Sequence, residues 1–245
     1  MDKDTYELAT GSNSGENSKN SSQMLLPFPL QPQLRFETFY SGENKVLLDQ
    51  LKSTKKTGIL SAPVWLWGKS GSGKTHLLQA VCAATNKRAI YLPLSSLKQK
   101  PEVLDDVASL DVVALDDVDV VIGDPEWDQA LFSVFNGLWN EGGTLLCSSK
   151  SPPRTLNYNL PDLHSRAGGS DIYQIKSLSE PDSILALRMR AQFIGLDLSE
   201  ESAKFLAKRV RRDMGTLCFW LEKLQRAAIL KQRKLTIPFI RDYLG

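Results

Sequence analysis

Short apolar runs alternate with amphipathic helical patterns through the middle of the chain. The apolar runs fall at residues 64–67, 89–92, 112–115, 144–148 and 172–175. The helical patterns between them fall at residues 74–84, 102–108 and 127–139. Strands separated by helices are typical of βαβ units. The pattern therefore predicts an α/β fold, with a parallel five-stranded sheet that is flanked by helices on both faces.

After residue 175 the strand pattern stops and only helical patterns follow. Ser179, followed by Asp182, forms a capping box that opens one helix, and Gly195 is placed to end it. Ser199 can cap a second helix, and residues 214–232 carry a regular leucine stripe that indicates a third. A short terminal helix with proline in its first turn completes the set. These patterns predict a small all-helical lid domain.

The chain divides into four predicted segments. Residues 1–22 are polar, and because they have little apolar surface to bury they are expected to form a disordered tail. The peptide 23–30 is apolar and punctuated by prolines, so it either packs on the domain's own surface or docks in a groove of another protein. Residues 31–177 form the α/β nucleotide-binding domain, and residues 178–245 form the helical lid.

Composition and charge are those of an ordinary globular protein. Thirty basic and 28 acidic residues give a net charge of +2, which argues against a strongly basic nucleic-acid coat but leaves a local patch open. The basic cluster at 208–212 fits a solvated helix end better than a phosphate or nucleic-acid site. No apolar run spans a bilayer, and the three scattered cysteines favour neither zinc nor disulfides. We therefore expect a cytoplasmic protein with no membrane contact.

One octapeptide matches the phosphate-binding loop of nucleotide-binding proteins. Residues 68–75 read GKSGSGKT, which fits G-x-x-x-x-G-K-[ST], and they lie between a predicted strand and a predicted helix. Glycines let backbone N–H groups converge on phosphate oxygens, and the helix N-terminus adds partial positive charge. Lys74 is expected to reach the β- and any γ-phosphate. The predicted nucleotide-binding residues here are Gly68, Lys69, Ser70, Gly71, Ser72, Gly73, Lys74, Thr75 and His76.

A neighbouring strand ends in two acids, as nucleotide hydrolysis requires. Four apolar residues precede Asp116 and Asp117. Asp116 is expected to hold Mg²⁺ together with the hydroxyl of Thr75, and Asp117 is the candidate general base that polarises the attacking water.

Two further positions matter if the chemistry involves another subunit. The strand at 144–148 ends in Ser148, Ser149 and Lys150, where a γ-phosphate could be probed. Arg166 precedes the last strand and is either a solvated charge or an arginine projected toward a neighbouring triphosphate.

Together these features resemble the AAA+ ATPases, and among them the bacterial initiator DnaA. Residues 36–44 are similar to the DnaA segment that lies over the adenine, which makes Phe36, Phe39 and Tyr40 candidate base neighbours. Residues 163–166 resemble the stretch that carries the arginine finger in that family. The resemblance implies that Arg166 acts in trans.

Features beyond the shared core resemble the Hda family of DnaA-related proteins. In that family an N-terminal Gln-x-x-Leu-Pro-aromatic peptide binds the β sliding clamp. Residues 151–157 and 233–239 are also similar to that family, and no helix-turn-helix follows the lid before Gly245. The clamp-binding residues that the resemblance implies are Gln23, Leu26, Pro27 and Phe28.

The resemblance implies a regulator that negatively controls the initiation of DNA replication. Bound to ADP or ATP with Mg²⁺ and tethered to the β sliding clamp of DNA polymerase III, it would stimulate hydrolysis of DnaA-bound ATP. DNA would be contacted only indirectly through the clamp, and a homo-oligomer stays open. Gly215 stands where an AAA+ lid arginine is expected, and Lys150 where DnaA-like proteins carry an acid, so we expect weak ATPase activity from this chain itself. The alternatives are a self-acting P-loop ATPase, such as a helicase loader, and a nucleotide-stabilised adaptor.

Overall fold

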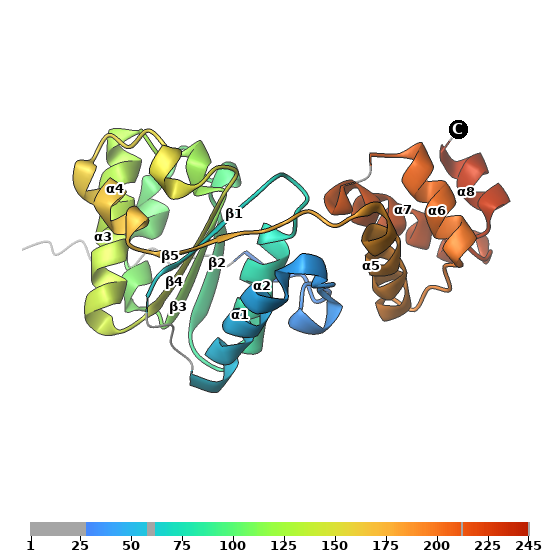
Figure 1. Ribbon diagram of the computed structural model, residues 1–245, viewed down its shortest axis with the longest axis horizontal. Helices are drawn as coiled ribbons and strands as arrows, with labels where there is room; N and C mark the ends of the chain where they lie inside the picture. The colour runs from blue at the N-terminus through green and yellow to red at the C-terminus, as the bar shows by residue number, and fades with distance from the viewer. Residues whose placement is uncertain (1–27, 58–61, 212, 245) are drawn as a thin grey trace, which may run out of the picture.

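The protein has an α/β body and a helical lid at one end of it (Figure 1). The computed structural model describes residues 28–57, 62–211 and 213–244. The predicted tail at 1–22 and most of the predicted clamp peptide, including Gln23, Leu26 and Pro27, lie outside these residues. None of the described helices is long and apolar enough to cross a membrane.

The body is built on a five-stranded parallel sheet, as predicted. Its strand order is β2-β3-β4-β1-β5, and every pairing is parallel. Since β1 lies between β4 and β5, the chain that leaves β1 emerges beside the carboxyl ends of these two strands, one strand away from that of β3. Ligands of open α/β sheets bind at this edge. The strands are β1 Val64–Trp67, β2 Ala89–Pro93, β3 Val112–Asp116, β4 Thr144–Ser149 and β5 Asp171–Gln174.

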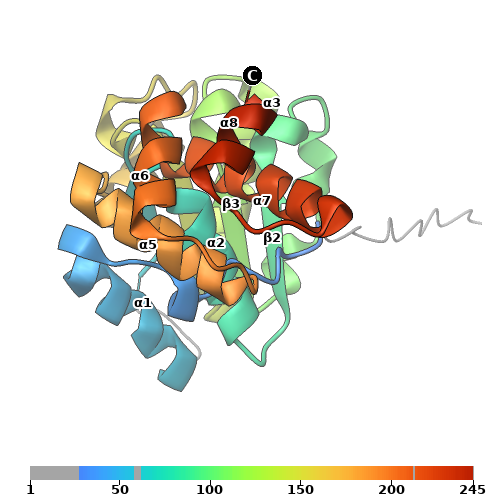
Figure 2. The same ribbon diagram turned by 90° about the vertical axis from the view of Figure 1, so that its right-hand side faces the viewer.

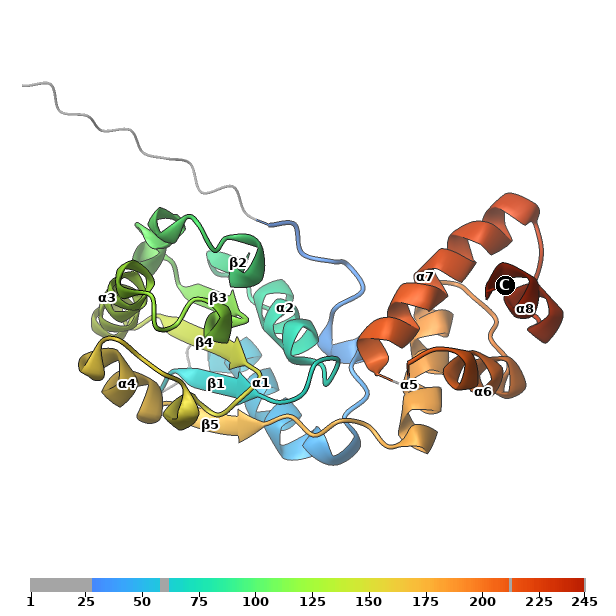
Figure 3. The same ribbon diagram turned by 90° about the horizontal axis from the view of Figure 1, so that it is seen from above.

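Helices cover both faces of the sheet and enclose two hydrophobic clusters (Figure 3). One face is covered by α3 and α4, which pack on the cluster around Trp65 and Leu131. The other is covered by α1 and α2, which pack on the cluster around Leu66 and Leu77. The helices of the body are α1 Lys45–Thr57, α2 Lys74–Ala84, α3 Pro125–Glu141 and α4 Pro161–Gly168.

The prediction of a helix at residues 102–108 is wrong. The structure has two short 3₁₀ turns there, Pro101–Leu104 and Val107–Ser109. Between them Asp105 is extended and Asp106 is left-handed with φ 62°, so no continuous helix forms. The apolar residues of the two turns pack against α3. Their spacing in the sequence resembles that of a helix, which explains the wrong prediction.

The lid consists of four helices, as predicted (Figure 2). Ser179 caps the first by accepting a hydrogen bond from the N–H of Asp182, and Ser199 caps the second through the N–H of Ser202. A separate apolar cluster, centred on Leu206 and other leucines, forms the core of the lid. The helices are α5 Glu180–Phe193, α6 Glu200–Arg209, α7 Met214–Lys231 and α8 Ile237–Leu244.

A buried carboxylate fixes the start of α4. Asp128 of α3 is fully buried and accepts a hydrogen bond from the backbone N–H of Gly123 at 3.0 Å. It also accepts from the N–H groups of Asn159 at 2.5 Å and Leu160 at 3.1 Å. Leu160 is the N-cap of α4, so Asp128 ties α4 to α3.

Asp128→Ala is expected to lower the free energy of unfolding by about 3 kcal/mol, because it removes a buried carboxylate that accepts three backbone hydrogen bonds. Urea denaturation monitored by circular dichroism measures the loss. Asp162→Ala removes an exposed acid from α4 itself and is expected to stay within ~0.5 kcal/mol of the parent. Equal losses in both variants would contradict the role assigned to Asp128.

Candidate nucleotide-binding site

A cavity of about 480 Å³ lies between the body and the lid. Its floor is the loop 68–75 with the start of α2, and one wall is the segment that leads into α1. The opposite wall comes from α5 and α7 of the lid. The predicted phosphate loop therefore opens into a space closed on the other side by the lid.

The glycines of the loop are required by its backbone and by close neighbours. Gly71 and Gly73 have φ values of 74° and 108°, in the left-handed region that favours glycine. A Cβ on Gly73 would lie 2.8 Å from the ring of Phe39, and a Cβ on Gly71 would lie 2.8 Å from the side chain of Asp213. Larger residues would fill the cradle in which phosphate oxygens are expected to sit, so the loop fits a nucleotide.

Lys74 is buried and held against the loop. Its Nζ donates hydrogen bonds to the carbonyl oxygens of Gly68 at 2.8 Å and Lys69 at 3.2 Å. Burial lowers the pKa of Lys74 from its ordinary value, and the carboxylates of Asp117 and Asp116 oppose this shift. The ammonium is thus placed on the cavity side of the loop, as the motif predicts.

Asp116 joins the phosphate loop to the sheet. Its buried carboxylate accepts hydrogen bonds from the hydroxyls of Thr75 at 2.6 Å and Tyr91 at 2.9 Å, and also from that of Ser148. Thr75 and Asp116, predicted to hold Mg²⁺, are therefore in direct contact. No cluster of three or more His, Cys, Asp or Glu side chains in the described chain could hold a metal alone. This pair fits a Mg²⁺ ion that takes its remaining ligands from phosphate and water.

The polar end of β4 supports Asp116 rather than the cavity. Ser148 contacts Asp116 and accepts a hydrogen bond from the N–H of Asp117 at 3.0 Å. Ser149 accepts from Nε1 of Trp65 at 2.7 Å and is likewise fully buried. Both serines therefore support the acidic strand end, and their predicted role in probing a γ-phosphate stays a prediction.

Asp117 is the one acid of the pair that lines the cavity. Its backbone is left-handed, with φ 57°, and Asp117 lines the cavity whereas Asp116 does not. Burial raises the pKa of Asp117, and the carboxylates of Asp116 and Asp119 raise it further. A carboxylate with raised proton affinity facing the phosphate loop is suited to the base role predicted for it.

Two of the predicted base neighbours, Phe39 and Tyr40, lie on one wall of the cavity, whereas Phe36 is buried in the core of the body. Phe39 packs edge-on against His76 with ring centroids 5.2 Å apart, and both line the cavity. His76 Nε2 lies 2.8 Å from the carbonyl oxygen of Arg35, and burial lowers the pKa of His76 to about 4. Tyr40 also lines the cavity, and its hydroxyl donates to Asp182 of α5 at 3.0 Å. This wall is therefore tied to both α2 and the lid.

Arg166 lies outside the cavity. It is exposed on α4, and its guanidinium makes no hydrogen bond or ion pair with any described residue. Leu163 and Ala167 of the same helix are buried in the core and fix the helix that carries it. Arg166 is thus presented outward rather than to the phosphate loop of its own chain.

Sequence analysis missed a buried arginine on the lid side of the cavity. Arg190 of α5 is 4% exposed and donates from Nη1 to the carbonyl oxygen of Gln33 at 2.8 Å. Its Nη2 contacts Glu222 of α7 at 3.0 Å, whereas its Nε has no partner in the described chain. All three residues lie far apart in sequence. The available signal was a cation on the otherwise apolar face of α5.

The lid touches the phosphate loop where an AAA+ arginine is expected. Gly215 lies against Gly71, and Asp213 caps α7 through the N–H of Thr216 at 2.9 Å. Among the described residues, the charged side chain that lies against Gly71 is the acid Asp213, which is the N-cap of α7.

Comparison with known proteins agrees with this architecture. The family described as the bacterial DnaA ATPase domain matches residues 30–169, and the Hda lid domain matches residues 180–244. Domain III of the Thermotoga maritima replication initiation protein DnaA is 23% identical, with a TM-score of 0.74 over 87% of this chain and 96% of that one.

Two longer structures are similar over their shared part. AMPPCP-bound DnaA from Aquifex aeolicus is 24% identical, with a TM-score of 0.66 over 82% of this chain and 66% of that one. The RuvB Holliday junction branch migration motor of Thermotoga maritima is 16% identical, with a TM-score of 0.63 over 86% of this chain and 72% of that one. This chain thus spans 66% of the Aquifex chain, and the likeness to these structures shows a shared fold.

Lys74→Ala is expected to abolish ADP binding, because Lys74 is the cation that the loop directs toward the terminal phosphates. Isothermal titration calorimetry measures the affinity, and the melting temperature checks that the fold is kept. Lys87→Ala removes an exposed ammonium from the body outside the cavity and is expected to retain the affinity. Unchanged ADP affinity in Lys74→Ala would refute the phosphate-loop assignment.

His76 is expected to remain neutral down to about pH 4, since burial disfavours its charged form. In the unfolded chain its pKa is near 6.5, so the unfolded state binds the proton first as the pH falls. Stability should therefore decrease between about pH 6.5 and 4, by up to ~1.4 kcal/mol per pH unit from this group.

NMR titration of a His164→Gln variant leaves the His76 ring as the only imidazole to follow. A His76 midpoint near 6.5 would contradict the buried, hydrogen-bonded position described above. Comparing the pH dependence of unfolding with that of His76→Gln isolates the contribution of this residue.

Proposed function

Since the chain belongs to the DnaA family of AAA+ proteins and carries an Hda lid, we propose that it negatively regulates replication initiation by acting on DnaA. In this proposal the chain is held on the DNA-loaded β sliding clamp and stimulates hydrolysis of the ATP bound to DnaA. The observation that carries the proposal is the position of Arg166, exposed and unpaired on a helix anchored in the core.

Arg166 has the chemistry for a finger in trans. A planar guanidinium can bind two phosphate oxygens at once, and charge placed on the transition state of phosphoryl transfer accelerates hydrolysis. Asp128 holds the start of α4, so the side chain would approach a partner from a fixed base with little loss of backbone entropy. Arg166 does not line the cavity of its own chain, which favours action on another subunit.

The nucleotide of this chain would serve mainly to hold the body and lid together. ADP or ATP would bind with its phosphates on the loop 68–75, Mg²⁺ between Thr75 and Asp116, and the base against Phe39, Tyr40 and His76. A bound Mg²⁺ would neutralise phosphate charge. Since α7 presents Gly215 and Asp213 to the loop, hydrolysis by this chain itself would be weak.

The clamp tether is proposed from the sequence motif. Gln23 offers an amide that can donate and accept, and Leu26 and Phe28 are apolar anchors. Phe28 is half-buried and packs against both clusters of the body, which accords with the simpler interpretation of that residue as part of the domain surface. Variants that test the tether should therefore change Gln23 and Leu26 and leave Phe28 in place.

Two other functions make different demands on the same residues. A self-acting ATPase such as a helicase loader would use Arg166 within a ring of identical chains and hydrolyse its own ATP. A nucleotide-stabilised adaptor would need neither Arg166 nor Asp117. Two measurements distinguish the three functions: which substitution abolishes activity, and whether the ATP that is hydrolysed is bound to DnaA or to this chain.

Arg166→Ala is expected to reduce the stimulated hydrolysis of DnaA-bound ATP by roughly two orders of magnitude or more, with ADP affinity and melting temperature unchanged. Arg166→Lys should restore little, because an ammonium cannot bind two phosphate oxygens as the fork does. The measurement is the conversion of DnaA-ATP to DnaA-ADP with and without DNA-loaded clamp.

Arg154→Ala is the matched control, since it removes an exposed arginine from the turn Pro153–Thr155 just before α4 and should keep full stimulation. If Arg166→Ala leaves DnaA inactivation intact but abolishes the chain's own ATPase, the loader function takes precedence. The proposed tether would be refuted if hydrolysis of DnaA-bound ATP were stimulated without clamp, or by Gln23→Ala/Leu26→Ala with clamp. The role of Arg166 would not be affected by that result.

A further inference from the structure

The net charge of the chain is close to zero, but basic and acidic residues are unevenly distributed along the sequence. Residues 204–244 contain 11 basic and 3 acidic side chains, a net charge of +8. The rest of the chain has 19 basic and 25 acidic side chains, a net charge of −6. Charge asymmetry of this size between two parts of one chain is typical of proteins that contact a polyanion.

Most of the positive charge in this region is not neutralised by ion pairs among the described residues. Of its three acids, Asp213 lies 3.7 Å from Arg211 and Glu222 lies 3.0 Å from Arg190. This leaves Asp242 as the acid without an ion pair in the described chain. Exposed cations that have no ion pair with any described residue include Lys208, Arg209, Arg226, Arg233, Lys234 and Arg241.

Aromatic rings hold several of these cations in place. The guanidinium of Arg209 lies 5.1 Å from the centre of the Phe205 ring, and that of Arg241 lies 5.8 Å from the same centre. Arg233 lies 5.5 Å from the centre of the Phe239 ring. Cation–π contacts of this kind orient a guanidinium without cancelling its charge. Two arginines from different helices are thereby kept together although their charges repel.

The cations lie at the end of the lid that faces away from the nucleotide cavity. Helices α6 and α8 are in contact and form that outer end (Figures 1 and 3). None of the residues that line the cavity comes from either helix. The charge therefore serves neither the phosphate loop nor the contact between lid and body.

Capping of a helix explains only part of the pattern. Lys208 and Arg209 lie in the last turn of α6, where the helix dipole favours a cation. Arg241 lies in the last turn of α8 and Arg233 just after the end of α7, so helix dipoles favour cations at these positions too. The dipoles do not explain why Arg209 and Arg241, from two different helices, share the ring of Phe205. A surface that binds a negatively charged partner accounts for all of these cations.

We propose that this distal lid face binds the phosphate backbone of duplex DNA directly and without sequence specificity. Guanidinium groups fit phosphate oxygens in pairs, and phosphates recur along the duplex at a spacing that several exposed cations can follow. This direct contact with DNA is additional to the proposed tether through the clamp. Its test uses neither clamp nor DnaA, so a negative result would leave the proposed function unaffected. The face consists of Phe205, Lys208, Arg209, Arg233, Lys234 and Arg241.

The test is fluorescence anisotropy of a labelled 30-base-pair duplex of mixed sequence, titrated with the full chain at several salt concentrations. We expect affinity that falls steeply with salt, and an Arg209→Gln/Arg241→Gln variant that binds about tenfold more weakly at 0.1 M salt. The slope of log K against log salt should decrease in magnitude by about 1.8, since each lost phosphate contact contributes about 0.9.

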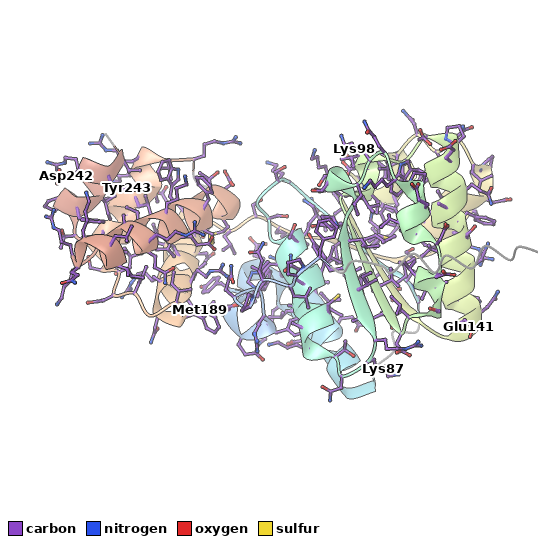
Figure 4. The ribbon with its side chains drawn as sticks, turned by 180° about the vertical axis from the view of Figure 1, so that it is seen from behind. Lys87, Lys98, Glu141, Met189, Asp242 and Tyr243 are labelled. Carbon is purple, nitrogen blue, oxygen red and sulfur yellow. The ribbon has the colours of Figure 1, made fainter. Side chains whose placement is uncertain are left out.

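The matched control is Lys87→Gln/Lys98→Gln, which removes two exposed charges from the body, far from Asp242 and Tyr243 at the outer end of the lid (Figure 4). It should bind as the parent does. Lys208→Gln/Lys234→Gln keeps every ring contact and should also weaken binding, which guards against a folding defect in the arginine variant. Melting temperature and ADP affinity should be unchanged in all three.

Absence of binding at 50 mM salt would overturn the proposal, as would equal losses in the lid and body variants. Binding of vesicles of anionic phosphatidylserine that depends on Arg209 and Arg241, without DNA binding, would assign the face to a membrane surface instead and would also overturn it.

Discussion

A single buried carboxylate holds the candidate site together. Asp116 accepts hydroxyl hydrogen bonds from Thr75 on α2, Tyr91 on β2 and Ser148 on β4. A buried carboxylate is stable only when such donors satisfy it, and here each donor belongs to a different element of the body. The phosphate loop, the acidic strand end and the neighbouring strands therefore keep one relative position. The geometry of nucleotide binding follows from that position.

The lid closes the site by a second set of polar contacts. Arg190 joins α5 to Gln33 and Glu222, and Tyr40 joins the segment before α1 to Asp182. These contacts lie on the cavity walls, and a ligand in the cavity would touch both sides. The outer half of the lid does something different, because Lys208, Arg209 and Arg241 lie beyond these contacts and form no ion pair with the described part of the chain. One small domain thus combines a wall of the nucleotide cavity with a separate charged surface.

Local patterns were enough to predict most of the fold. The five strands, α2, α3 and the four lid helices were found from periodicity and capping residues, which act over a few neighbouring positions. Helices α1 and α4 were not predicted: α1 is rich in lysine, and α4 is a short eight-residue helix that begins with a proline. The false helix at 102–108 arose because apolar residues in two separate 3₁₀ turns happened to share a helical spacing.

The sequence by itself determined the phosphate loop, the acidic strand end and the order of domains, because each depends on residues adjacent in the chain. Only the tertiary structure decided how these residues meet. It turned Ser148 toward Asp116, set Asp128 beneath α4, and brought Arg190 to Gln33 across 157 residues of sequence. It also gathered the cations of α6, α8 and the turn between α7 and α8 at one end of the lid. Such contacts depend on packing between distant segments, which no local pattern of side chains records.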